Sequence, residues 1–389
     1  MNLKERVNSI YPELVELRRS IHEEPEVGMD TVKTKDKIVA LLKEKNIQYR
    51  TTSKNGIIVD IKGTKEESNQ VVLLRADMDA LCLQENTDLP YASKEDGKMH
   101  ACGHDLHSSM LVGTAIILND LKDTFSGTIR CIWQPGEETS QGATHMIEEG
   151  VMDNVKMGFG MHVDPLSPTG TLSAKRGADW AAVDHFEICV KGIGAHGATP
   201  QKGKDAIVAA SALVLNLQTL VSRECDPMKP LVITVGQFHG GSSYNIIANE
   251  VYLEGTCRSF DEEVYDALPS ALDRVVKNTA QAYGCEATIN LDRVAKAVIN
   301  DDEAFDVLEI TANKVLDAEN FQKAEPAMIG EDFSEYGQIA PCVFTHLGCD
   351  GGYPLHSCYV NFKEEAMLTG IEIEIQFGLD ALEYLTKKV

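Results

Sequence analysis

The segment HACGHDLH, from His100 to His107, gathers three imidazoles, one thiol and one carboxylate within eight residues. Neutral imidazole and deprotonated thiol are the side chains that hold zinc-like divalent ions in proteins. Packing alone does not account for so many such groups in one short stretch. We therefore interpret this segment as half of a metal site, and we expect the remaining ligands to come from other parts of the chain.

Three other short segments carry residues that suit the same site. They are WQPGEE at 133–138, GMHV at 160–163 and PLHS at 354–357. Each follows an apolar or β-branched run typical of a buried strand, and a fourth such run, VVLLRA, leads into RADMDAL. Open α/β sheets bind ligands at the carboxyl ends of their strands, so we expect the polar residues to converge on one rim. They are Asp77, Asp79, Cys102, His104, Glu137, Glu138, His162 and His356.

Taken in order, RADMDAL, HACGHD, WQPGEE, a later isolated histidine and PLHS resemble the amidohydrolase branch of the M20 metallopeptidases. This branch includes hippurate hydrolases, N-acyl-amino-acid aminoacylases, indole-acetyl-amino-acid hydrolases and N-acetyldiaminopimelate deacetylases. Each motif is weak by itself, but the ordered set is highly specific. Further segments extend the resemblance over nearly the whole chain, namely RRSIHEEPEVG, GIGAHGATP, YNIIA, GTCRSF and GEDFS.

The resemblance implies five metal ligands and two divalent ions. The ligands carried over are Cys102, His104, Glu138, His162 and His356. One tetrahedral ion uses four ligands, so two ions bridged by the Cys102 thiolate explain five more simply. Most M20 relatives have an aspartate at the bridging position, and the thiol is the hallmark of this branch. Sulfur favours zinc, but relatives also work with manganese, cobalt or nickel, so the metal stays open.

The resemblance also divides the labour between two adjacent glutamates. Glu138 would hold metal, while Glu137 would take a proton from the attacking water and pass it to the leaving nitrogen. A solvated acidic loop is the alternative interpretation. Asp79 would orient a ligand histidine, and Asp77 stands where many M20 enzymes have a metal-binding histidine, which makes it a doubtful ligand. For both aspartates, capping of the following turn is an equally good interpretation.

Three more residues are expected to act from a second domain. His196 corresponds to a histidine that stabilises the oxyanion in relatives, often from the partner subunit. Asn245 and Arg258 match positions that contact the substrate carboxylate, which a guanidinium binds in a bidentate manner. An ordinary loop histidine and a surface ion pair remain the alternatives. The branch usually has a histidine at the position of Gln201, so the polar chemistry of this loop can differ.

The length of the chain predicts two domains, and the resemblance implies an M20-like α/β fold. From 183 to 294 the order reads strand, helix, strand, strand, helix, strand, which is the βαββαβ order of a ferredoxin-like domain. This domain would be an inserted lid that also serves dimerisation. The flanking parts, 1–182 and 295–389, must reunite as a catalytic domain with a mixed sheet, because His356 is needed beside Cys102. Its helices are expected at Leu3–His22, Thr31–Lys45, His104–Leu121 and Phe362–Lys387.

Composition limits the partners and the location. The net charge of −24 disfavours nucleic acid and anionic membranes, which both need a positive surface. No apolar stretch reaches the roughly 20 residues that span a bilayer. The N-terminus, MNLKERVNSI, lacks the apolar core of a signal peptide, and ten scattered cysteines favour reduced thiols. We therefore expect a cytoplasmic protein, and the resemblance adds a homodimer or higher homo-oligomer formed through the lid.

These observations predict a metal-dependent amidohydrolase with a small-molecule substrate. It would cleave the amide of an N-acyl or aryl-acyl amino acid into a carboxylic acid and a free amino acid. The alternatives among hydrolases are an N-acetyldiaminopimelate deacetylase and a small-peptide carboxypeptidase. A non-catalytic metal-binding scaffold on the same fold is the alternative from another class, and it would be favoured by loss of Glu137 or a ligand. All of these residues are present.

Overall fold

The structure, a computed structural model, describes residues 2–388. The chain splits into two compact units. Unit 1 comprises Met1–Asp179, Ile299–Glu325 and Asp332–Val389, and unit 2 comprises Trp180–Val298 and Pro326–Glu331. The short segment 326–331 therefore groups with unit 2, whereas the sequence prediction assigned 295–389 entirely to the catalytic domain.

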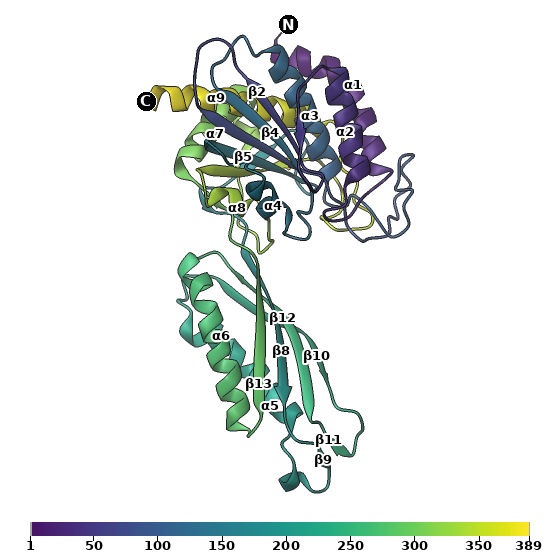
Figure 1. The fold of residues 1–389 in the computed structure, drawn as a ribbon, viewed down its shortest axis with the longest axis vertical. Helices are drawn as coiled ribbons and strands as arrows, with labels where there is room; N and C mark the ends of the chain where they lie inside the picture. Colours follow the sequence, from purple (N-terminus) through teal and green to yellow (C-terminus); the bar gives the residue numbers. More distant parts are fainter. Residues whose placement is uncertain (1, 389) are drawn as a thin grey trace. The chain divides into compact units, whose positions relative to one another are not determined.

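Unit 1 is built on a mixed eight-stranded sheet (Figure 1) with the strand order β1-β2-β4-β3-β5-β16-β6-β15. The central strands β4, β3, β5 and β16 are parallel neighbours, and β2 and β6 pair antiparallel on either side of them. The strands are β1 Arg50–Thr51, β2 Ile57–Lys62, β3 Val71–Asp77, β4 Thr128–Gln134, β5 Val155–Asp164, β6 Leu172–Ala174, β15 Phe321–Lys323 and β16 Cys342–Gly348. A separate ribbon pairs β7 Gly177–Ala178 with β14 Ile299–Asn300.

Helices cover both faces of this sheet. Gly370 lies against Met161 of β5, whereas the preceding strand residue, Gly160, faces Phe333. Successive strand residues point to opposite faces of the sheet. The helix that contains Gly370 therefore lies on one face of the sheet, and the helix that follows Phe333 lies on the other. The helices of unit 1 are α1 Leu3–His22, α2 Val32–Glu44, α3 His104–Asp120, α4 Gly142–Glu148, α7 Asp302–Val315, η3 Ala318–Asn320, α8 Ser334–Gly337 and α9 Ala366–Lys388.

Helix α3 is the central helix of unit 1. It is buried from His104 to Leu118, because its sequence is predominantly apolar from Met110 to Leu118. Its first turn is polar yet equally buried, and buried polar groups must find partners. The position of α3 therefore forces His104, Asp105 and His107 into contact with the strand ends and loops beside them.

Unit 2 has the βαββαβ order that the sequence predicts. Its antiparallel sheet has the order β10-β12-β8-β13, and Figure 1 shows α5 and α6 beside it. Buried side chains alternate along β8, so one face of the sheet carries the core of this unit. The elements are β8 Ala182–Lys191, β9 Ala195–His196, η1 Pro200–Lys202, α5 Ala206–Thr219, the π-helical turn η2 Leu220–Glu224, β10 Leu231–Gly240, β11 Ile246–Ile247, β12 Glu250–Ser259, α6 Glu262–Ala282 and β13 Glu286–Ala295.

One helical stretch, Ala206–Glu224, is long and apolar enough to cross a membrane by length and composition alone. The sequence analysis expected no such stretch. One side of it packs into the core of unit 2 through Ala209, Leu213 and Leu217, and a third of it is buried. Core helices of proteins without membrane spans pass the same test, so this finding is weak support for a membrane span.

Candidate metal centre

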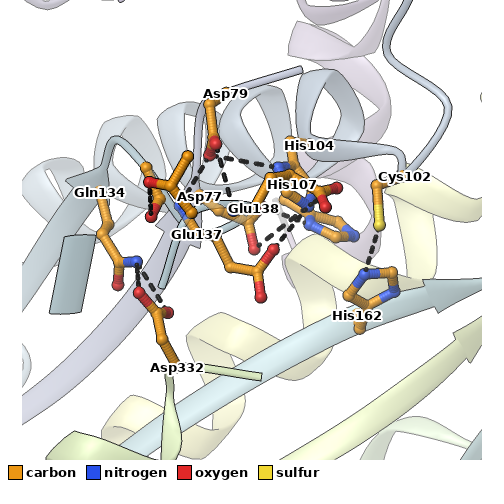
Figure 2. A network of polar contacts seen from close by, with 12 residues as sticks. Asp77, Asp79, Cys102, His104, His107, Gln134, Glu137, Glu138, His162 and Asp332 are labelled. Carbon is orange, nitrogen blue, oxygen red and sulfur yellow. Dashed lines mark hydrogen bonds and ion pairs between the residues drawn. The ribbon is translucent and has the colours of Figure 1, made fainter. Parts of the chain in front are cut away.

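The polar residues at the strand ends of unit 1 converge as the sequence predicts (Figure 2). Ligand atoms of Cys102, His104 and His162 lie within 4.8 Å of one another, and so do those of Cys102, Glu138 and His356. These two groups contain all five expected ligands and share the thiol. The structure thus brings the five residues together, from the loop before α3 and the first turn of α3, from β5, from the β4–α4 loop and from a loop after β16.

Gly103 explains how neighbouring Cys102 and His104 both reach the site. Its φ of +87° lies in the left-handed region that side chains with a Cβ avoid. A Cβ there would also lie only 2.3 Å from Cγ2 of Val163 on β5. The glycine therefore lets the chain turn sharply into α3 while it touches β5, which places the thiol and the first imidazole of α3 on one side.

The hydrogen bonds of His162 direct one ring nitrogen toward Cys102. Its Nδ1 donates to the carbonyl oxygen of Val163 at 2.8 Å, so Nε2 carries the lone pair. That Nε2 lies 3.3 Å from Sγ of Cys102. Burial, followed by the nearby His107, holds the pKa of His162 well below its usual range, which keeps the ring neutral. A neutral ring with a free lone pair is the form that binds metal.

His107 has a different role, because both of its ring nitrogens are occupied. Nδ1 donates to Oδ1 of Asp77 at 2.6 Å, and Nε2 accepts from the backbone N–H of Val163 at 2.9 Å. The ring therefore connects Asp77 to the backbone of β5 next to His162. Asp77 is likewise engaged by His107 and by Arg75 at 2.5 Å, which agrees with its interpretation as a doubtful ligand.

His104 and Glu138 carry buried polar atoms without hydrogen-bond partners among the described residues. These atoms are both ring nitrogens of His104 and Oε1 of Glu138. Nε2 of His104 lies 3.9 Å from Oε1 of Glu138 and 3.7 Å from Oδ2 of Asp77, and its Nδ1 lies 3.6 Å from Oδ1 of Asp79. Orphaned buried groups are costly unless something binds them. The nitrogen atoms of His104, Oε1 of Glu138 and the sulfur of Cys102 lie close together, and donor atoms of these kinds bind divalent cations.

Residues 135–141, which we call the glutamate loop, carry Glu137 and Glu138. The two carboxylate oxygens of Asp79 accept from the backbone N–H groups of Glu137 and Glu138, at 3.0 and 3.2 Å. Asp79 therefore holds the middle of this loop while it faces His104. The sequence left two roles open for Asp79, orientation of a histidine and capping of the following turn. The geometry supports both roles, but the turn that Asp79 caps belongs to the glutamate loop, far along the chain.

His356 joins the site from an unusual backbone conformation. Its φ is +63°, a region uncommon for residues other than glycine. Its backbone N–H donates to the carbonyl oxygen of Ala101 at 3.0 Å, which ties this loop beside Cys102. Nε2 of His356 lies 3.6 Å from Oε1 of Glu138, and 53% of the side chain is exposed. His356 is thus the open side of the centre.

The electrostatics of the centre favour a cation. Burial disfavours the charged form of His104, but Asp77, Asp79 and Glu138 outweigh it and raise the pKa of His104 to about 10. Burial, then the carboxylates of Glu138 and Glu137, raise the pKa of the Cys102 thiol well above its usual value. The two shifts share one contribution, a concentration of buried carboxylates that stabilises positive charge and opposes further negative charge. A bound cation would balance the negative charge of these carboxylates and would displace the proton of the Cys102 thiol.

The three residues expected to act from the lid all lie in unit 2, but at two ends of its sheet. His196 on β9 and Asn245 before β11 share one ribbon, in which Asn245 O accepts from the N–H of Gly197 at 2.8 Å. Arg258 lies on β12 opposite Val183, eight residues beyond Glu250 at the other end of that strand. Within this unit the structure brings His196 and Asn245 together and separates them from Arg258.

The sequence analysis missed a buried network around Arg75, Gln134 and Asp332. Arg75 lies in an otherwise apolar strand, which was the available signal, because a charged side chain inside a buried strand requires a partner. The partner Asp332 lies 257 residues away in GEDFS, at 2.9 Å. No local pattern connects the two, and only the fold does.

Comparison with known proteins gives the family. The sequence profile of peptidase family M20/M25/M40 matches residues 73–378. An N-acetyl-L-cysteine deacetylase of Bacillus subtilis (strain 168) is 37% identical over 95% of this chain and 89% of its own length. The hippurate hydrolase of Campylobacter jejuni is 35% identical over 98% of this chain and 100% of its own length.

A solved structure extends the likeness to three dimensions. The Bacillus subtilis YXEP protein, described as a dinuclear metal binding peptidase from the M20 family, superposes with a TM-score of 0.86. It is 34% identical and covers 97% of this chain and 99% of its own. Profile, relatives and fold agree over almost the full length, so the chain belongs to peptidase family M20/M25/M40.

Proposed function

We propose that the protein is a metal-dependent amidohydrolase that cleaves the amide bond of N-acyl or aryl-acyl amino acids, releasing a carboxylic acid and a free amino acid. One observation carries the proposal: two groups of metal ligands share Cys102 and lie beside Glu137. The names of the relatives, a deacetylase of an N-acetyl amino acid and a hippurate hydrolase, support this substrate class.

Two divalent ions fit the donor set. Cys102, His104 and His162 would hold one ion, and Cys102, Glu138 and His356 the other. When bound, such ions supply an acidified water and polarise the amide carbonyl. Imidazole and thiolate suit zinc best, and manganese, cobalt and nickel remain candidates.

Glu137 would move the protons of the reaction. Its Oε2 lies 3.9 Å from Nε2 of His104, at the edge of the donor set, and its backbone is fixed by Asp79. As the water oxygen bonds to the amide carbon, the carboxylate takes the water proton. It then gives that proton to the nitrogen as the carbon–nitrogen bond breaks, which releases the amino acid as a neutral leaving group.

Arg258 is the proposed partner of the substrate carboxylate. Its guanidinium is half-buried and has no ion-pair partner within residues 2–388, and burial lowers its pKa. A desolvated guanidinium is stabilised by a carboxylate that binds through two parallel hydrogen bonds. This favours substrates with a free α-carboxylate over simple amides.

His196 would serve the active site of a second copy. Eight residues of β12 separate the ribbon end of the sheet from Arg258, which corresponds to about 26 Å of extended chain. Figure 1 shows β9 and β11 beyond that end of the sheet of unit 2. A substrate of this class is much shorter, so one lid cannot supply both Arg258 and His196 to it. A homodimer resolves this, because the partner subunit then supplies His196 and Asn245.

The outer surface of unit 2 offers a place for that second copy. The edge strand β10 is ten residues long, and long unpaired edges normally have a cover. Helix α5 beside it is apolar on its exposed side too. The exposed apolar residues there are Ile207, Val208, Leu215, Val232 and Phe238. We propose that β10 and α5 form a dimer interface.

A paired substitution tests the proposed chemistry. Glu137→Gln should retain its metal by elemental analysis, yet lose turnover by about 10²- to 10⁴-fold, because it removes only the proton carrier. The adjacent Glu138→Gln is the matched control and should lose metal. Activity is measured on N-acetyl, N-benzoyl and indole-acetyl amino acids with zinc, manganese or cobalt. Normal turnover of Glu137→Gln would exclude the proposed role.

A further inference from the structure

We propose that Asp332 is a positioning residue that fixes the glutamate loop, and through it Glu137 and Glu138. The inference rests on the proposed function for the roles of these two glutamates. It depends on contacts at the base of the loop, about which neither the motifs nor the relatives say anything.

Asp332 binds both ends of the glutamate loop. Before the loop, Nε2 of Gln134, the last residue of β4, donates to both carboxylate oxygens of Asp332 at 2.8 Å. After the loop, the backbone N–H of Ala143 in α4 donates to Oδ2 at 2.9 Å. Figure 2 shows Gln134 and Asp332 side by side at one end of the polar network. A single carboxylate thus joins the strand that enters the loop to the helix that leaves it.

The loop is short enough for its base to control its tip. The N–H groups of Gln141 and Gly142 both donate to the carbonyl oxygen of Gly136, at 3.2 and 3.1 Å. A Cβ on Gly142 would lie 1.9 Å from the carbonyl oxygen of Pro135, so the two ends of the loop touch. Asp79 then binds the N–H groups of Glu137 and Glu138 at the tip. Asp332 holds the base and Asp79 holds the tip of one closed loop.

The amide of Gln134 has only one orientation in this network. Its Oε1 accepts from Nε of Arg75 at 3.1 Å and from the hydroxyl of Tyr336 at 2.8 Å, which leaves Nε2 to face Asp332. Arg75 also pairs with Asp332 at 2.9 Å and with Asp77 at 2.5 Å. All of these side chains are buried, so each charge and each hydrogen bond must be matched. The same guanidinium therefore connects the base of the loop to Asp77, which holds His107.

The sharpest test exchanges the two partners. Asp332→Asn removes the charge that balances Arg75 and weakens the base of the loop. We expect kcat to fall about 10- to 100-fold with KM nearly unchanged, as when a residue that orients a catalytic group is lost. The double variant Q134E/D332N restores an acid–amide pair with the two groups exchanged. Its kcat should be at least about tenfold higher than that of Asp332→Asn.

Two further measurements do not depend on turnover. Amide hydrogen exchange of the segment 135–143 should become faster in Asp332→Asn, because the N–H of Ala143 loses its charged acceptor. The affinity for cobalt, titrated against a chelator, should weaken about tenfold, because Glu138 is less well placed. If the wild type cleaves no N-acyl amino acid, the proposed function fails, and these two measurements still decide the role of Asp332.

Asp380→Asn is the matched control. Asp380 is also a buried, paired carboxylate, bound by Thr311 at 3.0 Å and Lys314 at 2.5 Å, but it lies on α9. This control should keep kcat and the exchange of 135–143. Equal losses in both variants would reduce Asp332 to a general stabilising residue, and wild-type values in Asp332→Asn would overturn the proposal. If Asp332→Asn does not fold, Gln134→Met cuts the same link, with the same expected and contrary results.

Discussion

At the residue scale, we propose that the thiol of Cys102 is a ligand shared by both positions of the centre. It belongs to both groups of ligand atoms, whereas His104 and His162 complete one and Glu138 and His356 the other. Its pKa is raised by burial and by Glu138, so the thiol keeps its proton until a cation takes its place. A shared ligand of this kind makes occupation of the two positions interdependent.

Cys102→Ser should therefore weaken both positions. A hydroxyl is a poor, normally protonated ligand, so we expect metal affinity to fall by about two orders of magnitude and turnover to fall with it. Cys342→Ser, at a buried thiol of β16, is the control for loss of a buried sulfur. Metal content after gel filtration, measured by elemental analysis, checks the prediction. Retention of two ions per chain by Cys102→Ser would contradict a shared thiolate.

At the scale of elements, helix α3 has to be held firmly because its first turn carries His104. It packs against α9, where the buried Glu374 accepts a hydrogen bond from the hydroxyl of Thr114 at 2.5 Å. Burial raises the pKa of Glu374 to about 8, so the folded protein keeps this carboxyl neutral near pH 7. We therefore expect the contact between α3 and α9 to respond to pH.

This contact predicts a pH dependence of stability with a definite sign. The stability contribution of Glu374 is complete below its unfolded pKa, near 4.3, and is lost as pH rises through about 8. Glu374→Gln cannot ionise, so its stabilising effect relative to wild type should grow by about 3 kcal/mol between pH 5.5 and 8.5. Urea unfolding at the two pH values measures it.

Glu383→Gln, on the exposed side of the same helix, serves as the control. Its carboxylate pairs with Lys387 and is ionised in both states over this range, so its effect should not change between the two pH values. An equal effect of Glu374→Gln at pH 5.5 and 8.5 would show that this carboxyl is already ionised in the folded protein.

At the scale of the whole molecule, we propose that each active site combines residues of two chains. Arg258 and the ribbon with His196 lie at opposite ends of one lid sheet, so each site would combine the metal centre of one subunit with the histidine of its partner. Symmetric dimers place the same patch on both subunits, which suits the exposed side of β10 and α5.

Mixing two inactive variants tests this arrangement. Glu137→Gln and His196→Ala each disable both sites of their own dimers. In a mixed dimer, one site has an intact Glu137 and receives an intact His196, so full exchange should restore about a quarter of wild-type activity. Exchange is verified by mass spectrometry of tagged subunits. No recovery despite verified exchange would mean that each site is completed within one chain.

The sequence by itself determined the main elements and predicted the metal ligands. Apolar runs predicted the strands that end at Asp77 and Gln134 and the strand that contains His162, and the βαββαβ order predicted the topology of unit 2. Candidate metal ligands can be recognised from the sequence in the same way, because few side chains bind divalent ions and clusters such as HACGHD seldom serve another purpose. Local chemistry was enough for these features. The location in the cytoplasm stays a prediction.

The tertiary structure alone decided which distant residues support the ligands. Asp332 meets Arg75 across 257 positions, and Asp79 caps a loop that begins 56 residues later. It also paired His107 with Asp77 and with the backbone of β5. The physical reason is that a buried carboxylate or imidazole takes whichever partner packing brings within about 3 Å. That partner is set by the fold and leaves no periodic pattern in the chain.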